Sequence, residues 1–266
     1  MEPISEDPTA DLLVEYLGPV AVLTLNRPEV RNALSPRFWG EIAEAVTQLD
    51  QNQEIRVLVL TGTDPAFCAG FDLRGLSDED EGERSDRLAR ESAFVGMLPP
   101  HDMPIIAAVN GAAVTGGLEL ALSCDVLLAS DKARFADTHA KVGAMPGGGL
   151  TMLLPERVGP GRARRMSLTG VFIDADTAAL WGLVDDIVPH DELLPRALEL
   201  AQQMAQLEPA TVAELRSMYA AFSGRSGHDA LAEEQAWAKR WMADRFDRAR
   251  LREDRERIIE QGRTIS

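Results

Sequence analysis

Three short apolar runs in the first half of the chain constrain its fold more than any other feature. They are RVLVLTG at 56–62, IIAAVNG at 105–111 and DVLLAS at 125–130. Continuous runs of valine, isoleucine and leucine are typical of strands buried on both faces, as in a parallel sheet. Because segments with helical spacing separate the strands, the sequence predicts an α/β fold.

The N-terminal segment adds a hairpin and a helix to this pattern. LLVEYL at 12–17 and VAVLTLN at 20–26 alternate as two strands joined by a tight turn. LSPRFWGEIAEAVTQLDQN at 34–52 has apolar residues at helical spacing. Ser35 can cap this helix, and Pro36 fits its first turn.

Two further stretches differ in character from the first part of the chain. Residues 76–90 are charged and have no apolar periodicity, which predicts a surface loop, a possible lid, leading into a helix over 85–98. After residue 192 the pattern is helical throughout, and the last helical segment carries Trp237, Trp241 and Phe246 on an apolar face. Such a face packs on the body of the protein or on a neighbouring subunit, and we favour the neighbour.

Composition excludes several classes of function. The net charge of −16 disfavours nucleic acid and anionic membranes as partners. No apolar run approaches the ~20 residues of a membrane span, and the acidic N-terminus is unlike a signal or transit peptide. Cys68 and Cys124 are far apart, which fits two buried thiols in a reducing compartment. We therefore expect a cytoplasmic protein with no metal site.

Two glycine-containing turns, within 57–76 and 105–130, follow buried strands. In the second turn, Gly116 and Gly117 precede LELALSC, which predicts a helix start. Glycine lets a ligand approach the backbone, and the N–H groups at a helix start stabilise negative charge. Glu119 lies in this apolar helix, where a carboxylate is paired, protonated or catalytic.

These motifs together resemble the enoyl-CoA hydratase/isomerase (crotonase) family. The similar segments are AFCAGFDLRGL, PIIAAVNGAAVTGGLELALSCDVLLAS and RFADTHAKVGAMPGGGLTMLLPERVG, within a resemblance that runs from about Val20 to Val188. The resemblance implies a crotonase-like spiral of β-β-α turns over 1–191. It also implies a C-terminal helical region over 192–266 that packs in a homotrimer or a dimer of trimers.

The resemblance further implies an acyl-CoA thioester substrate and no separate cofactor, because coenzyme A is part of the substrate. By position, the backbone N–H groups of Phe71 and Gly116 would form the oxyanion hole for the thioester oxygen. Such donors stabilise an enolate, and losing one costs about 3–4 kcal/mol of barrier. Residues expected to contact the substrate are Phe71, Asp72, Leu73, Arg74, Gly116 and Arg31, the arginines as candidates for a CoA phosphate.

Glu119 falls on the family's first catalytic glutamate, and His139 stands where hydratases have their second. Histidine titrates near neutrality and can serve as acid or base. We therefore expect a hydratase in which Glu119 activates water and His139 supplies the proton to Cα. Asp137 would share a face with His139 if the segment is extended, and would then orient the imidazole or replace the missing carboxylate.

Two alternatives stay open from the sequence. A shift of the double bond from 3-enoyl to 2-enoyl thioester needs only one acid/base group, so an isomerase with Glu119 or His139 acting alone is the second hypothesis. A protein that binds acyl-CoA without turnover, or an RNA-binding relative, is the third. The presence of Glu119 argues against binding without turnover, and the net charge of −16 argues against RNA binding.

Overall fold

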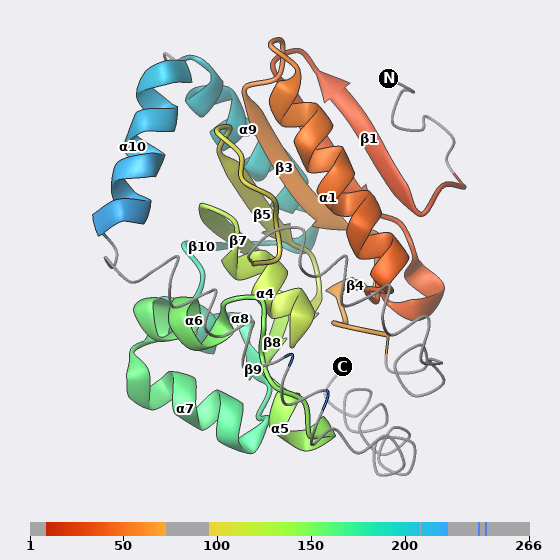
Figure 1. Ribbon diagram of the computed structural model, residues 1–266, viewed down its shortest axis with the longest axis vertical. Helices are drawn as coiled ribbons and strands as arrows, with labels where there is room; N and C mark the ends of the chain where they lie inside the picture. Colours follow the sequence, from red (N-terminus) through yellow and green to blue (C-terminus); the bar gives the residue numbers. More distant parts are fainter. Residues whose placement is uncertain (1–8, 73–95, 208, 223–238, 240–242, 244–266) are drawn as a thin grey trace.

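The computed structural model describes residues 9–72, 96–207, 209–222, 239 and 243 (Figure 1). Its main element is a sheet of six strands in the order β1-β2-β3-β5-β7-β10. These strands are β1 (Leu12–Leu17), β2 (Val20–Leu25), β3 (Val57–Gly62), β5 (Ile105–Val109), β7 (Val126–Ser130) and β10 (Asp186–Val188). Only β1 and β2 pair antiparallel within it.

A second sheet contains four short strands in the order β4-β6-β8-β9. They are β4 (Ala66–Cys68), β6 (Ala112–Val114), β8 (Arg134–Ala136) and β9 (Ile173–Asp174). Each of β3, β5 and β7 passes within a few residues into a strand of this sheet, and a helix follows β6 and β8. The chain thus winds as repeated β-β-α turns, as expected.

The helices, including two 3-10 turns, follow the strands in chain order. Those of the first half are η1 (Pro28–Val30), α1 (Pro36–Gln51), α4 (Gly116–Leu122) and α5 (His139–Val142). Those of the second half are α6 (Leu150–Val158), α7 (Pro160–Thr169), α8 (Ala175–Trp181), η2 (His190–Glu192), α9 (Leu193–Ala205) and α10 (Pro209–Phe222). Among the residues described, no helix combines the length and apolar character that a membrane crossing needs.

The core is divided by the six-stranded sheet into two layers. Alternate residues of β3 point to opposite faces. Leu58 and Leu60 join the larger core with α1 and the second sheet, while Val57 and Val59 face α9. Figure 1 shows α1 and α9 on opposite sides of the sheet. Both faces are therefore covered, which explains why β3 and β5 are entirely buried.

Local signals in the N-terminal segment are confirmed. β1 and β2 form the expected hairpin, with Gly18 in the left-handed region at φ 65°. The Ser35 hydroxyl accepts the N–H of Phe38 at 3.1 Å and caps α1, an interaction typically worth about 1 kcal/mol. Cys68 and Cys124 are buried free thiols, as expected, and burial raises the pKa of Cys68 to about 12.

The predictions for the loop and the C-terminal region have mixed outcomes. Residues 96–98, the end of the helix predicted over 85–98, form a bend in which Gly96 has φ 96°; the rest of that helix lies outside the described residues. α9 and α10 are helical as expected, and no strand occurs after 192 in the described part. The segment with Trp237, Trp241 and Phe246 lies outside it.

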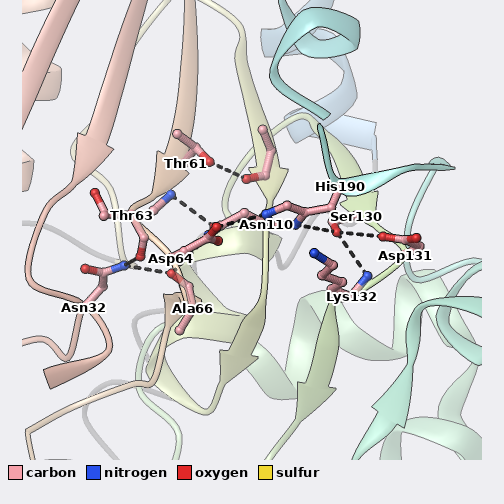
Figure 2. Close-up of polar contacts among 12 residues, drawn as sticks. Asn32, Thr61, Thr63, Asp64, Ala66, Asn110, Ser130, Asp131, Lys132 and His190 are labelled. Atoms are coloured by element: carbon pink, nitrogen blue, oxygen red, sulfur yellow. Dashed lines mark hydrogen bonds and ion pairs between the residues drawn. The ribbon is translucent and has the colours of Figure 1, made fainter. Parts of the chain in front are cut away.

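Side-chain hydrogen bonds tie together the carboxyl ends of the parallel strands (Figure 2). Asn110, after β5, donates to Asp64 Oδ1 at 2.9 Å. Asp64 Oδ2 lies 2.9 Å from His190 Nε2, and His190 Nδ1 lies 2.9 Å from the Ser130 hydroxyl. One chain of polar contacts thus joins the carboxyl ends of β3, β5, β7 and β10.

Candidate active site

Helix α4 places a carboxylate in the core. All seven residues of α4 are buried, and Glu119 has no exposed surface. The helix lies directly against β4, because a Cβ on Gly117 would overlap the carbonyl of Cys68. Only glycine allows this approach, so the glycine pair brings Glu119 close to the second sheet.

Glu119 receives a backbone hydrogen bond from the glycine-rich segment before α6. The N–H of Gly148 donates to Glu119 Oε1 at 2.9 Å. A Cβ on Gly148 would lie 3.0 Å from Glu119 Cδ and would overlap the Met97 side chain. A larger residue here would have to displace the Met97 side chain, and the Gly148 N–H fixes one oxygen of the carboxylate.

His139 faces the other oxygen of that carboxylate. Its Nε2 lies 3.9 Å from Glu119 Oε2, which is too long for a hydrogen bond and close enough for a strong charge interaction. His139 is 6% exposed and lies at the first position of α5. The structure thus brings together the two residues that the sequence placed 20 positions apart.

Asp137 contacts His139 through a turn of the chain. Its Oδ1 lies 2.7 Å from His139 Nδ1 and accepts the backbone N–H of His139 at 3.1 Å. The segment is not extended, so the condition under which the two residues would share a face is not met. The chain turns into α5 after Ala136, and the short aspartate side chain reaches forward to the N–H two residues on, a geometry that aspartate favours.

The environment of Asp137 favours the ionised carboxylate. Burial raises the pKa of Asp137, but hydrogen bonds with the His139 ring and the Ser167 side chain, together with the His139 charge, outweigh it. The net pKa lies below the ordinary value of an aspartate. His139 is therefore flanked by two buried carboxyl groups, and that of Asp137 is charged at neutral pH.

A pair of threonine hydroxyls fixes the two halves of the site to each other. Thr115, before α4, and Thr138, before α5, have their hydroxyl oxygens 2.6 Å apart, and the Thr138 N–H donates to Thr115 Oγ1 at 3.1 Å. Thr115 adopts φ 53° and ψ −110°, a conformation that costs a non-glycine residue free energy. These bonds hold Glu119 and His139 at a set separation.

The two predicted oxyanion donors lie side by side. A Cβ on Gly70 would lie 3.3 Å from the Gly116 nitrogen, and one on Gly116 would lie 3.5 Å from the Phe71 nitrogen. Phe71 and Leu34 form an isolated parallel β-bridge, in which the Leu34 N–H donates to the Gly70 carbonyl and the Asp72 N–H donates to the Leu34 carbonyl. The N–H of Phe71 therefore points away from Leu34. Gly116 begins α4, where a helix N–H has no acceptor within the helix.

Apolar side chains adjoin these donors. The rings of Trp39 and Phe71 meet edge to face, with centroids 6.0 Å apart and an interplanar angle of 88°. The Trp39 indole N–H donates to the carbonyl of Met97 at 2.8 Å. Met97 is buried and approaches Gly148, so apolar surface extends from the donors to Glu119.

Comparisons with known proteins decide the family. The sequence model of the enoyl-CoA hydratase/isomerase family matches residues 16–263. The chain is 36% identical over 201 residues to a probable peroxisomal enoyl-CoA hydratase of Arabidopsis thaliana, covering 76% of this chain and 75% of that one. It is 37% identical over 209 residues to a carnitinyl-CoA dehydratase of Citrobacter koseri, covering 77% and 78%.

Solved structures agree with the sequence comparison. The enoyl-CoA hydratase of Mycobacterium tuberculosis superposes with a TM-score of 0.79 at 41% identity, covering 88% of this chain and 100% of that one. An enoyl-CoA hydratase/isomerase of Pseudoalteromonas atlantica gives 0.79 at 29% identity, covering 95% and 98%. This chain belongs to the enoyl-CoA hydratase/isomerase family. The predicted family, its crotonase-type α/β fold and the expectation of an enzyme are thereby confirmed.

The structure describes some, but not all, of the residues predicted to contact the substrate in this family member. Arg31 has φ 55° and is partly buried, and its carbonyl accepts the N–H of Ala69, so it lies beside the turn that presents Phe71. Asp72 donates its N–H to the Leu34 carbonyl in the same turn. Leu73 and Arg74 lie outside the described residues, and their roles stay predictions.

Several residues that support the site in this family member were not predicted from the sequence. Gly148 lies in a run of three glycines, whose one signal is a tolerance for close backbone approach. The Thr115–Thr138 contact and the Ser167 contact join residues that are distant in sequence, so no local pattern predicts them.

Proposed function

We propose that this protein is an enoyl-CoA hydratase that adds water to 2-enoyl-CoA thioesters. The observation that carries the proposal is the pair of buried groups, Glu119 and His139, facing each other with 3.9 Å between Oε2 and Nε2. Hydration needs one group that removes a proton from water and one that delivers a proton to the substrate Cα. A carboxylate and an imidazolium meet this need at neutral pH.

The proposed steps balance as follows. Glu119 takes a proton from water, and the oxygen of that water bonds to the substrate Cβ. The electrons of the Cα–Cβ double bond move to the thioester oxygen as an enolate, which accepts hydrogen bonds from the N–H groups of Phe71 and Gly116. His139 then gives a proton to Cα, the enolate collapses to the thioester, and the substrate has gained one water.

For the coenzyme A part of the substrate, we propose contacts from Asp72, Leu73, Arg74 and Arg31. Arg31 lies beside the turn that carries Phe71, because its carbonyl accepts the N–H of Ala69. A guanidinium is suited to phosphate oxygens. No separate cofactor is needed for the steps above.

A second candidate is double-bond isomerisation by a single group. It is favoured by the Gly148 N–H, which holds one oxygen of Glu119 in place, so that this single carboxyl group could remove and return one proton. This reaction moves a proton from the Cα of a 3-enoyl thioester to its Cγ and adds no water.

The deciding experiment is a steady-state assay with crotonyl-CoA that follows the loss of enoyl-thioester absorbance. We expect robust hydration by the wild type and its loss in Glu119→Gln and His139→Ala. Conversion of 3-enoyl-CoA without hydration of crotonyl-CoA would favour the isomerase. Tight acyl-CoA binding with neither reaction would make the protein a binding module.

We also propose that the protein assembles as a homotrimer or a dimer of trimers. Leu168 on α7 and Leu180 on α8 are 76% and 78% exposed in the single chain, and a subunit contact over these helices would bury them. Sedimentation equilibrium checks the state, and a monomer at micromolar concentration would contradict it.

A further inference from the structure

We propose that Asp137 is the positioning residue of the reaction: it fixes the tautomer and the charge of His139, so that Nε2 is the nitrogen that exchanges a proton with the substrate. The inference rests on the proposed hydration and adds to it the group that makes His139 an acid. It is carried by three contacts, which involve Nδ1 of His139, the backbone N–H of His139 and the Ser167 side chain.

The first step concerns the tautomer. Asp137 Oδ1 lies 2.7 Å from His139 Nδ1, and an ionised carboxylate can only accept a hydrogen bond. The proton of this contact therefore belongs to Nδ1. The same oxygen also accepts the backbone N–H of His139, so the carboxylate cannot rotate away without losing two bonds.

The second step concerns the rigidity of Asp137 itself. Its side chain is 1% exposed, and the Ser167 hydroxyl on α7 donates to its carboxylate. Buried charged hydrogen bonds of this kind are stronger than neutral ones. Asp137 is therefore held by two different elements, α5 and α7, and the imidazole plane is held with it.

The third step concerns the direction and charge of the imidazole. With Nδ1 directed at Asp137, Nε2 is directed at Glu119. Among the described residues, the ionisable groups within 4 Å of the ring are Glu119 from α4 and Asp137 from the turn before α5. A carboxylate at 2.7 Å favours the imidazolium. His139 can then release the Nε2 proton and keep the Nδ1 proton.

The arrangement also returns the site to its starting state. After hydration, Glu119 holds the proton taken from water, and His139 is neutral at Nε2. Transfer of that proton from Glu119 to Nε2 restores the carboxylate and the imidazolium. The net reaction is then the addition of one water, and no proton is left behind in the site.

Two-bond ¹H–¹⁵N NMR of histidine-labelled wild-type protein reports which ring nitrogen carries the proton. The chain has four histidines, and the signal of His139 is assigned by its loss in His139→Gln. We expect a proton on Nδ1 throughout and a second proton on Nε2 in the charged form. A neutral ring protonated only at Nε2 would overturn the proposal without touching the hydratase activity.

The matching kinetic experiment uses Asp137→Asn, with Ser167→Ala as the milder variant. Loss of the charge lowers the pKa of the imidazolium, so the alkaline limb of the kcat profile for crotonyl-CoA moves about one to two pH units lower. Ser167→Ala moves it less, in the same direction. Unchanged limbs in both variants would overturn the role of Asp137, whereas a wild type without hydration would overturn the proposed function and leave the NMR test standing.

Discussion

Two histidines in the described part of the chain lie less than 3 Å from a carboxylate oxygen, and they differ in what their second ring nitrogen contacts. His190 bridges Asp64 and Ser130 with both ring nitrogens at 2.9 Å, and the Asp64 side chain is 61% exposed (Figure 2). His139 also uses one nitrogen at 2.7 Å, but its other nitrogen lies 3.9 Å from Glu119, and all three side chains are buried.

This difference in distance and burial distinguishes the structural role of the His190 cluster from the proposed catalytic role of the His139 cluster. In the His190 cluster every close distance is already a hydrogen bond, so the cluster ties strand ends together. In the His139 cluster the distance between Nε2 and Oε2 exceeds a hydrogen bond, so we propose that both atoms contact the same bound substrate from one side. Burial keeps the charges there unscreened, whereas solvent weakens those around Asp64.

The largest expected effect is on turnover. Glu119→Gln retains an oxygen for the Gly148 N–H but removes the base, so kcat for crotonyl-CoA falls by about 10²–10⁴-fold with little change in thermal stability. Glu41→Gln on the surface of α1 is the matched control, since Glu41 pairs only with the exposed Arg37 among the described residues. Equal turnover of the two variants would remove Glu119 from the reaction.

The next effect comes from the backbone support of Glu119. Gly148→Ala places a methyl group against Met97 and 3.0 Å from Glu119 Cδ, so overpacking lowers the free energy of unfolding by about 1–3 kcal/mol and turnover falls with it. Gly40→Ala, in α1, meets no atom within 4 Å and stabilises the helix by about 0.5–1 kcal/mol. Urea unfolding compares the two, and equal midpoints would argue against the tight approach at Gly148.

The His190 cluster is tested by a smaller loss of stability. His190→Ala removes the contacts with Asp64 and Ser130, which lowers the free energy of unfolding by about 1 kcal/mol because the cluster is partly solvated. Hydration by this variant is expected to match the wild type. A fall in kcat at unchanged stability would show that His190 takes part in the reaction, and would contradict its purely structural role.

A third histidine predicts a weak dependence of stability on pH. Burial lowers the pKa of His101, the Pro99 carbonyl opposes this, and the Arg216 guanidinium, which donates to Nε2, adds to it. The folded state therefore resists protonation, and stability falls as pH drops below 6.5, the ordinary value for histidine, toward the depressed value. In His101→Gln, the urea midpoint of unfolding should change less between pH 7.5 and 5.5 than it does in the wild type. An equal change in both proteins would assign the pH dependence to other groups.

Much of this architecture follows from local signals in the sequence. β3 and β5 are continuous apolar runs, and α1 has apolar residues at helical spacing and a cap at Ser35, so each is predicted by a physical rule. Strands β4, β6 and β8 have three residues each, too few to show a period. They form because their neighbours in the second sheet supply the hydrogen bonds.

The site was predictable where one residue conflicts with its surroundings. Glu119 is such a residue, because a carboxylate in an apolar helix needs a reason. His139 was found through the resemblance, but its contact with Asp137 depends on a turn, whereas the expectation from the sequence covered only an extended segment. Gly148, Thr115 and Ser167 support the site through contacts between residues that are far apart in the sequence. Such contacts have no fixed spacing, so the sequence alone does not predict them.

The central claim is that Glu119 and His139 act as one acid–base pair, and a double-mutant cycle on kcat for crotonyl-CoA tests it most directly. The cycle compares the wild type, Glu119→Gln, His139→Ala and the double variant. Groups that act as a unit are strongly non-additive, so we expect the double variant to be about as slow as the slower single one. Losses that multiply in the double variant, or full turnover without His139, would contradict the pair.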